Sequence, residues 1–130
     1  MRLDHLVLAV GSVGVTCDFY ARMLGMDVVT FEEGRRALLF GSQKINLQEA
    51  GKEFEPKARV PTRGSADLCF ITETPIAEVI AHLRTQGVEI ELGPVPRVDA
   101  ISGLESVYFC DPDGNLSEVA NLLSHNTATE

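Results

Sequence analysis

The chain has 130 residues, of which 45% are hydrophobic and 23% charged, a balance typical of one folded domain or of two small halves sharing a core. Its formal net charge of −8 argues against a nucleic-acid-binding or anionic-membrane surface, because both require clustered Lys and Arg. No apolar run approaches the roughly 20 residues of a membrane-spanning helix, and no signal peptide is recognisable, so we expect a cytoplasmic protein.

The first half of the sequence predicts a strand, a helix and three further strands. Residues 3–10, "LDHLVLAV", alternate and are rich in branched side chains, as in a strand. Val15, Phe19 and Met23 then recur every four residues, as on the apolar face of a helix, and Gly25 stands where a left-handed helix terminator belongs. Turn sequences separate the three short strands expected next, at 27–31, 36–40 and 44–48.

The second half repeats this order. Residues 66–72, "ADLCFIT", predict a strand, after which Thr74 and Pro75 predict the cap and the first position of a helix. Gly87 is expected to end this helix, whose apolar face consists of Ile76, Val79, Ile80 and Leu83. Alternating or apolar segments predict strands at 88–92, 106–109 and 115–121.

The two halves align in register. Gly25 and Gly87 lie 62 residues apart, and so do His5 and Asp67. We therefore predict an α+β domain over 1–125, made of two βαβββ modules: module one at 1–51, a linker at 52–64 and module two at 65–123. Because each module alone has too small a core to be stable, the two should form a curved mixed sheet around a concave site. The tail, 124–130, has no apolar face and is predicted to be disordered.

Four stretches carry a resemblance to a known family: "LDHLVLAV", "FYARMLGM", "QKINLQEAG" with the following "FEPKA", and "VYFCDPDGNLSEV". Together they resemble the vicinal oxygen chelate superfamily, which includes glyoxalase I, bleomycin and fosfomycin resistance proteins and extradiol dioxygenases. "FGSQKINL", "EFEPKA" and "GSADLCFIT" are similar to the subgroup of glyoxalase domain-containing protein 5 and related bacterial virulence proteins. The resemblance implies paired βαβββ modules that hold a divalent metal ion, a small-molecule substrate and a homodimer.

The resemblance also implies a set of metal ligands. His5 stands at the first ligand position and Glu118 at the last, whereas Asp67 occupies a position at which glyoxalases and fosfomycin resistance proteins usually have His. Gln48 stands where relatives often carry His or Glu, with Asn46 as an alternative on the same strand face. Each residue could instead have no role in metal binding: His5 could be hydrogen-bonded or on the surface, Glu118 on the surface, and Asp67 a capping residue before a strand.

The chemistry of these residues narrows the choice of metal and reaction. A buried carboxylate needs partners, and a cation would satisfy Glu118, Asp67 and His5 together. One imidazole with two carboxylates and an amide suits hard cations such as Mn(II), Mg(II) or Fe(II), with Ni(II) and Zn(II) as further candidates. Extradiol cleavage uses two His and one carboxylate, and is disfavoured because His82 lies on the second helix and His125 in the tail.

We expect a divalent-metal-dependent lyase, isomerase or transferase acting on a small polar substrate, in which Glu118 could instead move a proton as the catalytic base. The alternative is a non-catalytic binding or sequestering protein of the resistance type. Cationic side chains could hold an anionic substrate, although each is more simply a solvated surface group: Arg36, Lys44, Lys57 and Arg97. Phe54, Tyr108 and Phe109 are expected mainly in the core. Cys17, Cys69 and Cys110 are interpreted as small buried apolar residues in a reducing compartment.

Overall fold

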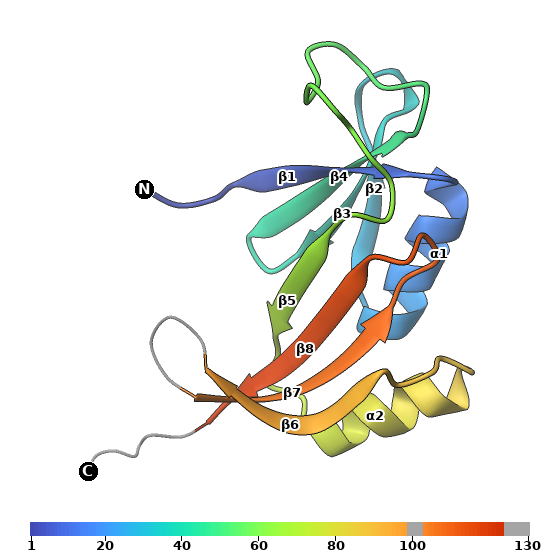
Figure 1. The fold of residues 1–130 in the computed structure, drawn as a ribbon. Helices are drawn as coiled ribbons and strands as arrows, with labels where there is room; N and C mark the ends of the chain where they lie inside the picture. Colours follow the sequence, from blue (N-terminus) through green and yellow to red (C-terminus); the bar gives the residue numbers. More distant parts are fainter. Residues whose placement is uncertain (99–102, 124–130) are drawn as a thin grey trace. The chain divides into compact units, whose positions relative to one another are not determined.

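A computed structural model of the protein describes residues 1–98 and 103–123. Over these residues the chain forms two α-helices, one short 3-10 turn and eight strands (Figure 1). In chain order they are β1 (His5–Val10), α1 (Val13–Leu24), β2 (Asp27–Thr30), η1 (Glu32–Gly34), β3 (Arg36–Phe40), β4 (Gln43–Glu49), β5 (Asp67–Ile71), α2 (Ile76–Thr85), β6 (Leu92–Val98), β7 (Gly103–Cys110) and β8 (Leu116–Leu122). No helix in this described part is long and apolar enough to cross a membrane. The tail predicted to be disordered, 124–130, lies outside the described residues.

The chain divides into two compact units. Unit 1 comprises Met1–Ala66 and the turn Asp111–Asn115, and unit 2 comprises Asp67–Cys110 and the chain from Leu116 onward. Their sheets have the orders β1-β4-β3-β2 and β5-β8-β7-β6, so each strand of one sheet has its counterpart in the other. In each sheet the first pair is parallel and the other two are antiparallel. The predicted α+β fold of two βαβββ modules is confirmed.

Strand alternation gives each sheet one face covered by a helix and one open face. In unit 1, α1 packs on β3 and β4, and the strands bury Leu8, Leu38 and Ile45 on that face. His5 and Val7 point the opposite way, since successive side chains of a strand alternate. In unit 2, α2 packs on β7 and β8 above residues that include Val107, Phe109 and Val119. The open faces carry the polar and ionisable side chains that were predicted as site residues, among them His5 in unit 1 and Glu118 in unit 2.

The predicted helix ends are only partly confirmed. Gly25 follows α1 with φ 67°, a left-handed conformation that other residues rarely adopt. The expected cap of α2 by Thr74 is wrong, because Asn121 of β8 accepts the free N–H of Ile76 at 2.9 Å instead. The Asn121 amide also donates to the carbonyl oxygens of Thr72 and Thr74, both at 2.8 Å. A partner 45 residues away in sequence leaves no local signal.

The strand predicted at 88–92 is also misplaced. The structure has β6 at Leu92–Val98, and Val88 instead donates its N–H to Leu83 at the end of α2. Pro94 and Pro96 lie within β6, which argues against a strand when only the sequence is considered. β6 tolerates them because it is the edge strand of its sheet and has a register shift between Leu92 and Val95.

The turn "DPDGN" folds around a buried carboxylate. Asp111 is 5% exposed, and its Oδ1 accepts the backbone N–H groups of Asp113 at 2.9 Å and Asn115 at 3.0 Å. Its Oδ2 accepts the Tyr20 hydroxyl of α1 at 2.7 Å and the Asn115 side-chain amide at 2.8 Å. Asn115 in turn accepts the N–H of Ala66 at 2.9 Å. Four donors thus satisfy a carboxylate that would otherwise be costly to bury.

This network predicts a large loss of stability when its acceptor is removed. Asp111→Ala should lower the free energy of unfolding by about 3 kcal/mol, because the buried Tyr20 hydroxyl and Asn115 amide lose their partner. Tyr20→Phe removes one hydrogen bond to a charged group and should cost about 1.5–3 kcal/mol. Urea denaturation followed by circular dichroism measures both. Asp18→Ala, which breaks only an exposed pair with Arg22, is the control, expected below about 0.5 kcal/mol; an Asp111→Ala value equal to the control would contradict the role of the network.

Candidate functional site

Glu118 lies on the open face of the second sheet. Its direct neighbours across the strands are Cys69 on β5 and Tyr108 on β7. The hydroxyl of Ser106 donates to Glu118 Oε2 at 2.6 Å. No Lys, Arg or His among the residues that the structure describes forms an ion pair with this half-buried carboxylate. A half-buried charge supported by one hydrogen bond from an uncharged donor has capacity for a further partner.

An arginine and a tyrosine form a second polar pair on this face. Arg97 Nε donates to the Tyr108 hydroxyl oxygen at 2.9 Å, and the guanidinium carbon lies 5.4 Å from the centre of the Tyr108 ring. Arg97 also donates from Nη1 to the carbonyl of Pro96 at 3.0 Å. The arrangement leaves the Tyr108 hydroxyl proton available to a ligand. The sequence indicated Arg97 and Tyr108 separately but not their pairing.

Asp67 shares the open face with Glu118. It is exposed at the start of β5, opposite Leu116, whereas Glu118 is opposite Cys69, two positions further along. The two carboxylates therefore belong to neighbouring strands but to successive rows of the sheet. Glu118 bonds to Ser106, which lies in the row on the far side from Asp67.

His5 lies at the exposed start of β1 in unit 1. Its Nδ1 is 2.9 Å from Asp4 Oδ2. This hydrogen bond, together with the nearby positive charges of Lys44 and Arg2, lowers the pKa of the Asp4 carboxyl. Asp4 therefore orients the imidazole and stays ionised, while Nε2 points away from that bond and could bind a metal.

Gln48 shares the open face of the first sheet with His5 but is distant from it. His5 is opposite Lys44 on β4, whereas Gln48 is opposite Ala9, four residues further along. At the rise of a strand this separates the two by about 13 Å. Asn46 lies between them, opposite Val7, and its Oδ1 is buried with no hydrogen-bond partner among the residues that the structure describes. Within either unit, no three His, Cys, Asp or Glu side chains of the described residues are gathered closely enough to hold a metal ion.

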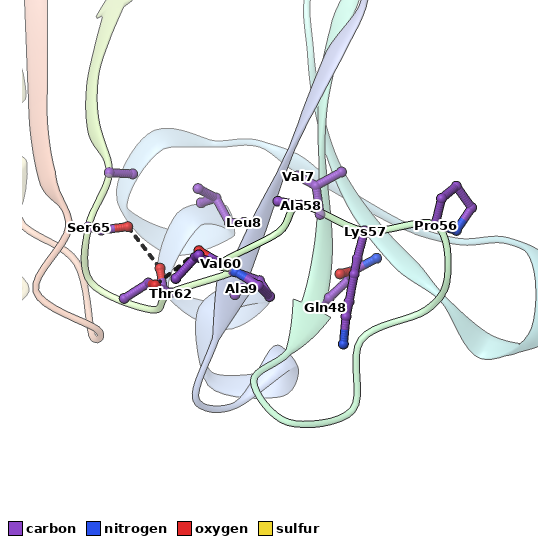
Figure 2. A pocket seen from close by; sticks show the side chains of 12 residues that line it. Val7, Leu8, Ala9, Gln48, Pro56, Lys57, Ala58, Val60, Thr62 and Ser65 are labelled. Carbon is purple, nitrogen blue, oxygen red and sulfur yellow. Dashed lines mark hydrogen bonds between the residues drawn. The ribbon is translucent and has the colours of Figure 1, made fainter.

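A cavity of about 570 Å³ opens beside β1 and β4 in unit 1 (Figure 2). The lining side chains come from these two strands and from the linker, as Figure 2 shows. Most are apolar, including Val7, Ala58 and Val60, and the polar contributors include Gln48 and Lys57. A largely apolar cavity of this size with a few polar groups is typical of small-molecule sites.

The linker beside this cavity is anchored by specific contacts. Glu53 accepts the N–H of Gly51 at 3.0 Å, and the backbone N–H groups of Gly51 and of Glu53 itself lower the pKa of the Glu53 carboxyl, with help from Lys57. Phe54 stacks under the guanidinium of Arg35, whose carbon is 3.8 Å from the ring centre. Lys57 Nζ lies 3.9 Å from Glu53 and 3.6 Å from Glu55, beyond ordinary hydrogen-bonding distance. The ammonium donors of Lys57 are therefore not committed to these carboxylates.

The interpretation of the three cysteines as buried residues holds only for Cys17. Cys17 is 3% exposed on the inner face of α1, whereas Cys69 is exposed and Cys110 half-buried. Both exceptions lie on the open face of the second sheet, where no helix covers them. Alternation within β5 could have placed Cys69 beside Asp67, but the sequence alone does not say which face is open.

The sequence model of the Glyoxalase/Bleomycin resistance protein/Dioxygenase superfamily matches residues 2–119. The chain belongs to this family. Virulence protein STM3117 of Salmonella typhimurium strain LT2 is 52% identical over 119 residues, which cover 92% of this chain and 83% of that protein. Its crystal structure matches with a TM-score of 0.92 over 95% of this chain and 98% of that one.

Other solved structures share the fold. An integron cassette protein from the mobile metagenome of V. cholerae matches with 53% identity and a TM-score of 0.91, over 93% of this chain and 94% of that one. At 18–20% identity, the likeness is one of fold alone. The fosfomycin resistance protein FosX of Listeria monocytogenes matches with a TM-score of 0.67 over 95% of this chain and 92% of that one. The antibiotic-binding protein TnmS3 of Streptomyces matches with a TM-score of 0.74 over 95% of this chain and 97% of that one.

The burial of the cysteines predicts their reactivity. Iodoacetamide at pH 8 should alkylate Cys69 first and leave Cys17 unmodified until the protein unfolds, because burial raises the pKa of the Cys17 thiol and blocks access to it. The pKa of the Cys17 thiol is higher in the folded than in the unfolded protein. The contribution of this thiol to the free energy of unfolding is therefore complete below the ordinary pKa of a thiol and is lost as the pH rises through the raised value. Peptide mass mapping over time measures the order. Early modification of Cys17 in the native protein, compared with a urea-unfolded control, would contradict it.

Proposed function

We propose that the protein is a divalent-metal-dependent lyase, isomerase or transferase that acts on a small polar substrate. The proposal rests on Glu118, a half-buried carboxylate on an open sheet face that accepts one hydrogen bond, from a neutral serine hydroxyl, and forms no ion pair among the described residues. A bound cation would satisfy this charge. Membership of the superfamily supports the same reading.

The metal would be held by His5, Asp67 and Glu118, with Gln48 as the fourth and weakest donor. Two carboxylates on one face of the second sheet fit the oxygen ligands that hard cations prefer, and the His5 imidazole is oriented by Asp4. We favour Mn(II), Mg(II) or Fe(II) over Ni(II) or Zn(II), since the set has one nitrogen ligand and no thiolate. When bound, the ion would act as a Lewis acid on two adjacent oxygens of the substrate.

The protein would contribute positioning and proton transfer. Arg97 and Tyr108 lie on the same face as Glu118 and together present a cation and a hydroxyl donor to an oxygen of the substrate. Glu118 is the side chain best placed to move a proton, an alternative to service as a ligand. Exposed apolar side chains on the open faces, Val7 and Ile71 among them, favour a homodimer in which a second copy covers them. We place this dimer in the cytoplasm.

A second candidate function is binding without catalysis. The cavity beside β1 and β4 is about 570 Å³ in volume and mostly apolar, and the adjacent linker is anchored through Glu53 and Phe54. A preformed pocket binds a ligand without the cost of ordering a loop. A resistance-type protein would use Lys57 and Gln48 to orient a ligand that carries an oxygen acceptor and an apolar body.

The metal proposal predicts how individual variants behave. The wild-type protein, purified without chelator, should contain or take up one Mn(II) per chain. Glu118→Ala, Asp67→Ala and His5→Ala should each weaken Mn(II) binding by more than the 10–100-fold typical of losing an outer-shell partner, and Gln48→Ala should weaken it less. Elemental analysis and isothermal titration calorimetry measure the stoichiometry and affinity.

A carboxylate on the same sheet provides the control. Glu105→Ala removes an exposed carboxylate next to Ser106 in β7 and should leave the Mn(II) affinity unchanged. If Glu118→Ala behaves like Glu105→Ala, Glu118 is not a ligand. Asp67→His should shift the preference from Mn(II) toward Zn(II), because imidazole suits the softer ion.

The binding alternative predicts a metal-independent result at the cavity. Ala58→Phe fills part of the cavity and should weaken binding of the amphiphilic probe 1-anilinonaphthalene-8-sulfonate by about tenfold, the effect of losing about 1.4 kcal/mol of contact. Ala77→Phe on the exposed side of α2 is the matched control. Fluorescence titration measures both affinities, and equal binding by the two variants would remove the cavity as the binding site.

A further inference from the structure

We propose that Ser106 is a positioning residue that holds one oxygen of Glu118, so that the carboxylate presents only Oε1 to a cation or to a proton. The inference rests on the proposed function, since it assigns a task to the partner of the suggested metal ligand. It concerns residues of one compact unit, all of which lie on β7 and β8.

The hydrogen bond between Ser106 and Glu118 is short and its donor is buried. Ser106 is fully buried at 0% exposure, so water cannot replace the partner of its hydroxyl. The 2.6 Å separation from Glu118 Oε2 is in the short range found for hydroxyl groups that donate to a charged carboxylate. A bond of this kind is stronger than a neutral one, and breaking it would leave a buried hydroxyl without an acceptor.

The hydrogen bond also sets the direction of the Glu118 side chain. Across the strands, Ser106 is opposite Ala120, whereas the direct neighbour of Glu118 is Tyr108. To reach Ser106, the Glu118 side chain must therefore lean along β8 toward the row of Ala120. Asp67 lies in the opposite direction, in the row of Leu116. The serine thus fixes where the free oxygen of Glu118 points.

The consequence is a restricted mode of binding. The serine hydroxyl engages one lone pair of Oε2, so Oε1 is the oxygen of Glu118 that is free to meet a cation. A cation held through Oε1 would keep more coordination positions for water or substrate oxygens. Without the serine, the carboxylate could turn and bind the cation through both oxygens. A ligand held in one orientation by an outer partner also loses less side-chain freedom when it binds.

The competing explanation is that Ser106 is a structural residue that merely satisfies its own hydroxyl. Both explanations predict some loss of stability in Ser106→Ala. Only positioning predicts a change at the metal. Ser117 offers a matched control, because it is also a fully buried serine, in β8, but its side chain points to the opposite face by alternation.

The experiment compares the wild type with Ser106→Ala, Ser106→Cys and Ser117→Ala, using Mn(II) alone as the probe. Electron paramagnetic resonance in 17O-labelled water gives the affinity and the number of bound waters. Ser106→Ala should raise the Kd by about 10–100-fold and lower the number of bound waters by one as Glu118 chelates. Ser106→Cys, a weaker donor of similar size, should lie between, and Ser117→Ala should match the wild type. Unchanged affinity and hydration in Ser106→Ala would overturn the inference.

A second readout works without metal. In protein labelled with 13C at the glutamate carboxyls, the Glu118 resonance is the one lost in Glu118→Gln. Loss of the hydrogen bond should shift this resonance in Ser106→Ala and not in Ser117→Ala. If the wild type binds no Mn(II) but the resonance shifts, the metal proposal fails and the positioning of a metal ligand fails with it, although Ser106 does hold one oxygen of Glu118. If the resonance does not move, Ser106 does not hold the carboxylate.

Discussion

The arrangement of the second sheet depends on the hydrogen bonds that the buried carboxylate of Asp111 accepts. It closes the turn through Asp113 and Asn115 and accepts the Tyr20 hydroxyl. Asn115 then fixes the N–H of Ala66. Ala66 and Asn115 are the residues directly before Asp67 and Leu116, the first paired residues of β5 and β8. The network therefore fixes the starts of the two strands that carry Asp67 and Glu118. A slip of one residue in either strand would turn the side chain of that strand to the helix-covered face.

The repeat of the fold could be predicted from the sequence, because its signals are local. Alternating strands and the terminator at Gly25 depend only on neighbours along the chain. The wrong predictions concern features that depend on contacts between distant residues or on the position of a strand in the sheet. β6 was misplaced because Pro94 and Pro96 are acceptable only on an edge strand, and strand order is invisible in one sequence. The cap of α2 was missed because Asn121 comes from another element.

In the candidate site, too, the sequence predicts the residues but not the long-range contacts between them. His5, Asp67 and Glu118 were predicted from the resemblance to the superfamily, whose sequence model matches residues 2–119. The contacts that give these residues their chemistry could not be predicted. Ser106 meets Glu118 and Arg97 meets Tyr108 only once the strands are paired and the open face is known. Gln48 shares a face with His5 but lies four residues along it, beside a cavity partly lined by the linker.

We propose that Glu118 binds a cation through one oxygen while Ser106 retains the other. Anomalous diffraction from crystals grown with Mn(II) tests it most directly. We expect an anomalous peak about 2.0–2.2 Å from Glu118 Oε1, within the range of carboxylate oxygens on divalent metals, with Oε2 still bonded to the Ser106 hydroxyl. A Mn(II) peak that lies away from Glu118, or no ordered Mn(II) at a saturating concentration, would contradict it.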